Sequence, residues 1–123
     1  MSIHSEAQAL MDRMVQAYRA GDAIGCAAIF TEDAILYSPY AVAARGRDAI
    51  EALHRDWTAH GGDAKILTVL ETGSSGDLGW CLATYSEGEV AGNGTSLNIL
   101  ARQPNGRWLI RMCSLSADAP PLA

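Results

Sequence analysis

The first third of the chain carries apolar residues at helical spacing. Apolar side chains recur three or four positions apart over residues 8–18, which is typical of a helix with one buried stripe. The stripe consists of Ala7, Leu10, Met11, Met14, Val15 and Tyr18. Gly21 can end this helix in a left-handed conformation, and Asp22 can cap a short second helix that includes residues 27–30.

A strand and a third helix follow. Residues 34–37 are strand-like, and a turn at residues 45–47 restarts a helix over residues 48–59, which the glycines at 61 and 62 end. One face of this helix carries Ile50, Leu53, His54 and Trp57.

From residue 64 onward the pattern changes to strands. The predicted strands are 65–70, 78–86, 94–102 and 108–116, with turns at 74–77 and 103–106. Helices first and antiparallel strands afterwards predict an α+β fold, with the helices packed on one side of a bent sheet.

Both faces of the predicted strand 78–86 are apolar. Trp80, Leu82 and Thr84 alternate with Cys81, Ala83 and Tyr85. A sheet that is apolar on both faces needs a second cover, which another copy of the chain can supply. We therefore expect a homodimer through the sheet face, burying about 1,200–2,000 Å².

Composition limits the classes of protein. The 123 residues fit one domain over 1–123, and 49% hydrophobic against 19% charged residues favours a globular chain. The net charge of -5 and the lack of a basic run argue against a nucleic-acid partner. No apolar run reaches the ~18 residues of a membrane span. The first residues also lack the positive start and apolar core of a secretion signal.

The cysteines and histidines offer no ligand spacing. The cysteines are Cys26, Cys81 and Cys113, and the histidines are His4, His54 and His60. The cysteines lack a CxxC pair, so we expect buried free thiols in a reducing cytoplasm. The histidines are spread over separate segments, so we expect no metal and no cofactor.

The order of turns and strands resembles the nuclear transport factor 2-like superfamily, which includes ketosteroid isomerases and SnoaL-like polyketide cyclases. The resemblance covers roughly residues 6–116. It is carried by Ala20-Gly21-Asp22, Ala34-Ile35-Leu36-Tyr37 before Pro39, Gly46-Arg47, Gly76-Asp77-Leu78 and Gly106-Arg107-Trp108. It implies a cone-shaped α+β barrel, with three N-terminal helices packed on a strongly curved, mostly antiparallel sheet around a pocket.

The resemblance also implies which chemistry is missing. Ketosteroid isomerases use a carboxylate base in the strand before a proline, a tyrosine on the first helix and a protonated acid on a later strand. In this chain the position of the base is Ser38 and that of the tyrosine is Met14. The position of the protonated acid falls at or next to Asn98. Serine is too weak a base to take a carbon-bound proton, and methionine cannot donate a hydrogen bond. We therefore expect no steroid isomerisation by that mechanism.

The pocket implied by the resemblance is mildly polar. Its candidate residues are Met14, Ser38, Tyr40, His54, Trp57, Leu82, Thr84, Ser96, Asn98, Arg111 and Cys113. Thr84, Ser96 and Asn98 are expected to face inward with Trp80, Leu82 and Leu100 as walls. Arg111 and Cys113 share a parity on the last strand, although a one-residue slip would reverse their direction.

Each candidate also fits a structural role. His54 is a candidate acid or base but fits a helix-surface or structural histidine better, Arg111 fits an interface ion pair, and Cys113 fits an inert small side chain. Three functions stay open: a domain that binds a small apolar molecule, an isomerase or cyclase acting on an apolar carbonyl compound through His54, and a non-catalytic dimerisation module. The residues favour the first.

Overall fold

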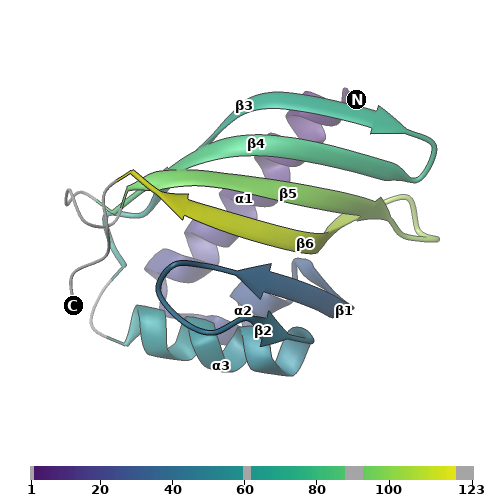
Figure 1. Ribbon diagram of the computed structural model, residues 1–123. Helices are drawn as coiled ribbons and strands as arrows, with labels where there is room; N and C mark the ends of the chain where they lie inside the picture. The colour runs from purple at the N-terminus through teal and green to yellow at the C-terminus, as the bar shows by residue number, and fades with distance from the viewer. Residues whose placement is uncertain (1, 60–61, 88–92, 119–123) are drawn as a thin grey trace.

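A computed structural model of the chain describes residues 2–59, 62–87 and 93–118 (Figure 1). Gly61 and His60, which entered the predictions above, lie outside these ranges. The helices and strands in chain order are α1 (Ile3–Arg19), α2 (Ala23–Ala27), β1 (Phe30–Tyr37), β2 (Ala44–Arg45), α3 (Arg47–Thr58), β3 (Ile66–Ser75), β4 (Leu78–Ser86), β5 (Gly94–Arg102) and β6 (Trp108–Ala117).

The strands form one six-stranded sheet in the order β2-β1-β6-β5-β4-β3. Only the β1–β6 pair is parallel; the other neighbours in this sheet are antiparallel. The α+β class and the mostly antiparallel sheet are confirmed. The barrel is not: β2 and β3 lie at opposite edges of the described sheet and do not pair.

The three helices also do not form one leading group, because β1 and β2 come between α2 and α3. The strand character of β1 extends back to Phe30, where it pairs with Ile110 of β6. The second helix is correspondingly earlier than predicted and ends at Ala27.

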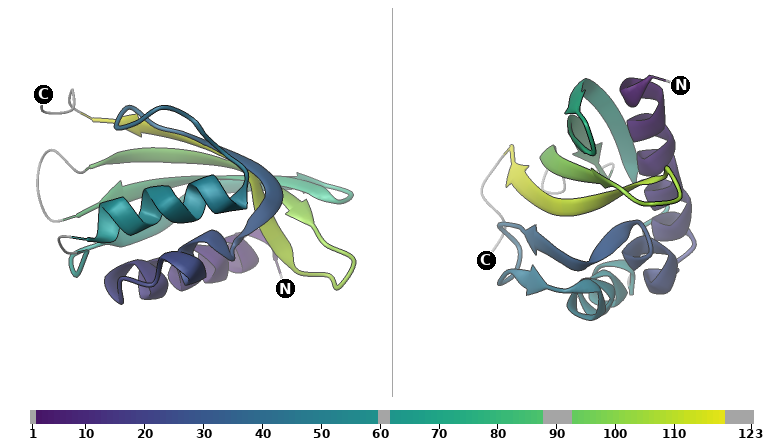
Figure 2. Two further views of the ribbon diagram at one scale, coloured as in Figure 1. Left: turned by 90° about the horizontal axis from the view of Figure 1, so that it is seen from below. Right: turned by 90° about the vertical axis from the view of Figure 1, so that its right-hand side faces the viewer.

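The helices cover one face of the curved sheet (Figure 2). Helix α1 begins at an N-cap Ser2, whose side chain accepts from the Ser5 N–H, and it packs mainly against β3. Helix α3 packs against α2, β1 and β2. The predicted stripe of α1 is buried except for Val15, which is half-buried.

The core lies between this face and the helices. Its most enclosed large side chains are Phe30, Ile29, Ile50, Leu100 and Ile110, and Asn98 is buried among them. All three cysteines are buried free thiols, as expected. Within the described ranges, no helix has the length and apolar character needed to cross a membrane.

Candidate functional site

A small cavity lies between the concave face of the sheet and the helices. Its volume is about 50 Å³, and it is only partly enclosed. That space can hold a few water molecules or a few carbon atoms. Its helix-borne lining residues are Met11, Met14, Tyr18, His54 and Trp57. The other lining residues are Ile29, Phe30, Leu36, Lys65, Leu67, Tyr85, Ser96, Asn98, Ile110, Cys113 and Leu115.

Six of the candidate residues therefore meet at one cavity. They are Met14, His54, Trp57, Ser96, Asn98 and Cys113. Tyr40 does not line the cavity but contacts two residues that do. Its hydroxyl lies 2.7 Å from that of Tyr85, and its ring packs edge-on against Trp57 at 6.2 Å between centroids. The roles of all these residues toward a ligand stay predictions.

Leu82 and Thr84 lie on the other face of the sheet, contrary to expectation. In the β4–β5 pairing, Ala83 is opposite Ser96, so these two residues share a face. Side chains alternate along a strand, and Leu82 and Thr84 therefore point away from the cavity. Alternation along β4 alone does not determine which of its faces is inward, because that depends on the register of β4 against β5.

Arg111 does not follow the direction of Cys113 either. A bulge lies in the β5–β6 pairing, where Ile99 is opposite Met112 but Leu100 is opposite Ile110. Arg111 is the extra residue, so Ile110 and Cys113 both reach the cavity and Arg111 does not. The Arg111 guanidinium instead lies with its Nε 3.4 Å from Asp33 Oδ1.

Ser38 follows the end of β1 and is not among the lining residues. Its Oγ accepts a hydrogen bond from the backbone N–H of Tyr40 at 3.3 Å. A serine in this arrangement stabilises a turn.

His54 is the most enclosed titratable side chain among the predicted pocket residues. The residue is only 3% exposed, and its ring packs between Tyr18, Phe30 and Trp57. Nδ1 lies 2.8 Å from the carbonyl oxygen of Ile50. A carbonyl only accepts, so Nδ1 carries the proton and Nε2, on the opposite side of the ring, is left as an acceptor. Burial lowers the pKa of His54 to about 4, and the imidazole is therefore neutral at pH 7.

Asn98 and Ser96 form a polar patch on β5. The Asn98 amide nitrogen donates to Ser96 Oγ at 3.1 Å, and both residues are buried. The Asn98 side chain also forms a hydrogen bond with Cys81, which lies opposite it on β4. The Ser96 hydroxyl accepts from Asn98 and keeps its own proton, so the patch can still offer a donor at the cavity wall.

Lys65 is the functional candidate that the pattern of the sequence missed. It is the one lysine of the chain and directly precedes β3. Its backbone is held on both sides: its N–H donates to the Gly62 carbonyl at 3.1 Å, and its carbonyl accepts from Arg19 Nε at 2.9 Å. Its side chain lines the cavity and is only 12% exposed. A lysine at a strand start normally extends into solvent, so the sequence held no signal for this placement.

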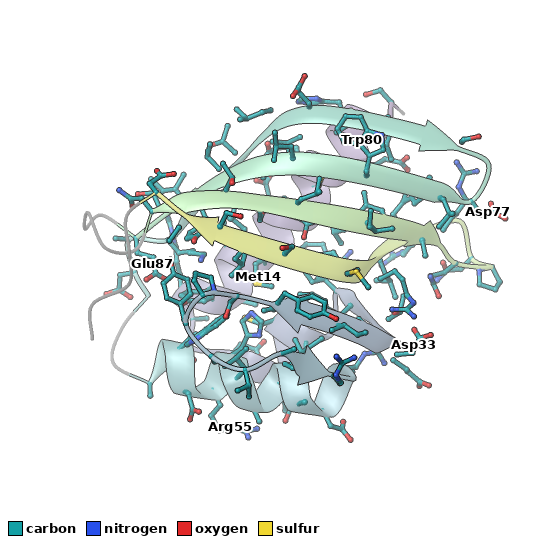
Figure 3. The ribbon with its side chains drawn as sticks, viewed as in Figure 1. Met14, Asp33, Arg55, Asp77, Trp80 and Glu87 are labelled. Carbon is teal, nitrogen blue, oxygen red and sulfur yellow. The ribbon has the colours of Figure 1, made fainter. Side chains whose placement is uncertain are left out.

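The Lys65 amine has aromatic and acidic neighbours. Nζ lies 4.5 Å from the ring centre of Tyr18, 5.1 Å from that of Tyr85 and 3.6 Å from Glu87 Oε1. Glu87 lies beyond the end of β4, at the margin of the sheet (Figure 3). Burial lowers the pKa of Lys65, and the Glu87 carboxylate opposes that shift.

Metal binding has no support in the described part of the chain, where no three His, Cys, Asp or Glu side chains come together. The cysteine in the cavity is also unreactive in this environment, since burial raises the pKa of Cys113 to about 12.

A curved, mostly antiparallel sheet with helices on its concave face and a cavity between them defines a nuclear transport factor 2-like α+β domain. The chain belongs to the SnoaL-like domain family, whose sequence profile matches residues 11–108. None of the curated protein sequences matches the chain.

Several solved structures have the same fold. A Nostoc punctiforme domain of unknown function with a cystatin-like fold has a TM-score of 0.80 at 19% identity, over 97% of this chain and 80% of that one. A ketosteroid isomerase-like protein from Erwinia carotovora atroseptica has a TM-score of 0.77 at 19% identity, over 95% and 97%. A Pseudomonas putida NTF2-like protein of unknown function has a TM-score of 0.71 at 21% identity, over 92% and 84%. At such identities the likeness establishes the fold alone.

Proposed function

We propose that this protein binds a small, mostly apolar molecule that carries one polar group. The observation that supports this is the composition of the cavity wall, where Met, Leu, Ile and Phe side chains surround a few polar groups from separate elements. Ligand sites in proteins have this character. A scaffolding role alone would instead favour a cavity filled by side chains.

The polar groups favour a carbonyl or hydroxyl on the ligand. Ser96 can donate from its hydroxyl, neutral His54 can accept at Nε2, and Lys65 can donate from its amine. The neutral His54 is a weak base near pH 7, so binding accounts for the site better than acid–base catalysis by this residue.

Binding can be tested with 1-butanol, since its short chain suits a cavity of about 50 Å³. Met11 and Met14 line the cavity, whereas Met112 does not. In ¹³C-methyl NMR spectra, 1-butanol should shift the Met11 and Met14 signals saturably and leave Met112 unchanged.

A matched pair of variants locates the effect. Leu115→Phe should fill part of the cavity and weaken the shifts, while Leu109→Phe, the same change at a β6 residue that does not line the cavity, should retain them. Methyl signals that do not respond to 1-butanol in the unmodified protein would contradict the proposal.

We also propose that the protein lacks steroid isomerase activity. Met14 and Asn98 line the cavity, but neither can act as a base, and the Ser38 hydroxyl is engaged in a turn. The cavity is also small for a steroid. Purified protein should not convert a Δ5-3-ketosteroid, and Ser38→Asp alone should not restore conversion. Turnover by the unmodified protein that His54→Ala abolishes would show that this expectation is wrong.

Assembly as a homodimer is a separate part of the proposal. The convex face of the sheet exposes large apolar side chains, including Leu78, Trp80, Leu97 and Ile99. Trp80 is visible on this face, in front of β4 and away from α1 (Figure 3). Such an extended apolar surface favours a partner, and a second copy offers the same surface in return.

A further inference from the structure

The placement of the Lys65 amine is unusual for a lysine. The side chain is mostly enclosed and lines a cavity whose wall is largely apolar, and its amine lies beside the rings of Tyr18 and Tyr85, which line the same cavity. A lysine that served only to carry surface charge would keep its amine in water. The location suggests that the amine meets whatever occupies the cavity.

Charged and titratable groups approach Lys65 from each packed element. Tyr18 faces it from α1, Tyr85 from β4 and Glu87 from the end of β4. Electrostatic interactions also couple it to His54 on α3, Cys26 on α2 and Cys113 on β6.

Glu87 is the only carboxylate within ion-pair distance of Lys65 among the described residues. It is itself about one-third exposed, and its separation from Nζ, 3.6 Å, is long for a hydrogen bond. The Glu87 carboxylate also forms a hydrogen bond with the Tyr18 side chain, so it is shared between the amine and this hydroxyl. Burial lowers the pKa of the amine more than this carboxylate raises it. The neutral amine, which is the nucleophilic form, therefore forms more readily than in an exposed lysine.

We propose that Lys65 Nζ is a nucleophile that captures the carbonyl group of a small apolar aldehyde or ketone as an imine. The inference rests on the proposed function, because it names the chemical class of ligand for the same cavity. Its geometric basis is that the chain's one lysine lines the cavity together with apolar side chains and Ser96, with its amine beside the rings of Tyr18 and Tyr85.

The reaction is a condensation and needs no oxidant or reductant. The Nζ lone pair forms a bond to the carbonyl carbon, and the carbonyl π electrons move to the oxygen. One proton passes from nitrogen to that oxygen and gives a carbinolamine. A proton from solvent water reaches the hydroxyl, the C–O bond breaks, water leaves, and the nitrogen lone pair forms the C=N bond of an iminium. The iminium then releases its remaining N–H proton to solvent, which balances the proton taken up. The amine and the carbonyl thus become an imine and water.

The neighbours of Lys65 suit these steps. The Glu87 carboxylate, 3.6 Å from Nζ, can accept the proton from nitrogen and return it to oxygen. The Ser96 hydroxyl can donate to the carbonyl oxygen as negative charge develops there. If the imine is protonated, its charge lies where the tyrosine rings and Glu87 already accommodate an ammonium.

The test uses butanal with sodium cyanoborohydride at pH 7, which traps an imine as a stable secondary amine. Because the chain has one lysine, peptide mapping by mass spectrometry separates Lys65 from the α-amino group. Lys65 should be alkylated at least about tenfold faster than Nα-acetyl-lysine amide, since the cavity holds the carbonyl beside the amine. Leu115→Phe should remove this acceleration, Leu109→Phe should keep it, and Lys65→Arg should leave label only at the α-amino group.

Alkylation of Lys65 no faster than the model amine would overturn the inference. The 1-butanol experiment then separates two cases. If the Met11 and Met14 signals still respond to 1-butanol, the binding function stands and only the imine is rejected. If they do not respond, both proposals are rejected.

Discussion

His54 both packs in the core and lines the cavity. Its ring fills space between Tyr18, Phe30 and Trp57, and it also lines the cavity. The hydrogen bond from Nδ1 to the Ile50 carbonyl fixes the neutral tautomer. The burial that makes His54 useful for packing therefore also makes it a poor proton donor near neutral pH.

The first prediction at this scale concerns acid sensitivity. The pKa of His54 is about 4 in the folded protein, against 6.5 for an unperturbed histidine. As pH falls through 6.5 the unfolded chain takes up a proton that the folded protein refuses, so folding stability decreases until about pH 4. Urea unfolding should show that the unmodified protein loses about 2–3 kcal/mol more than His54→Leu between pH 7.5 and pH 4.5.

His4 provides a matched control for that measurement, because it is an exposed histidine on α1. His4→Leu should retain the pH dependence of the unmodified protein. Equal losses of stability in the unmodified protein and in His54→Leu would mean that His54 is not desolvated as described.

At the scale of secondary structure, local sequence patterns were sufficient to predict features that depend on one helix or strand alone. The bounds of β4 and β5 are those predicted, and the Gly21 stop and Asp22 cap are confirmed: Gly21 has a φ of 69°, and the Asp22 side chain accepts from the Gly25 N–H. These features depend on alternation, turn residues and capping, which are all local in sequence.

Features that depend on pairing between distant segments were not predictable in the same way. The bulge at Arg111 exists only relative to β5, and the two-residue strand β2 exists only through its pairing with β1. The direction of Thr84 was wrong for the same reason, since its face is set by the register of β4 against β5.

The candidate site was predictable only in part, again for a physical reason. Met14, His54 and Asn98 could be placed at the cavity because the resemblance to a known fold supplied the tertiary arrangement. Lys65 was missed because its enclosure results from contacts with Tyr18, Tyr85 and Glu87, which come from other elements. No spacing along the chain encodes that set of contacts.

On the scale of the whole molecule, the two faces of the sheet differ in how they are covered. The concave face is covered by helices and holds the core and the cavity. On the convex face, Leu97 is 47% exposed and Trp80 is 40% exposed, and the helices of the described chain pack on the opposite side. Trp80 also packs over Gly73 on the neighbouring strand, where a larger residue would meet its indole ring. The convex face is therefore ordered, apolar and suited to association.

The last prediction is that two copies associate through this convex face. Burying about 800 Å² on each copy would remove Leu97, Trp80 and their neighbours from water. Leu97→Glu should place a charge inside the interface and, by the two-fold symmetry, a like charge near it. Analytical ultracentrifugation at ten micromolar should give a dimer for the unmodified protein and a monomer for Leu97→Glu. The same substitution at an exposed position of α3, Ala52→Glu, should leave the dimer intact. An unmodified protein that sediments as a monomer, or a Leu97→Glu variant that remains a dimer, would show that this face is not the interface.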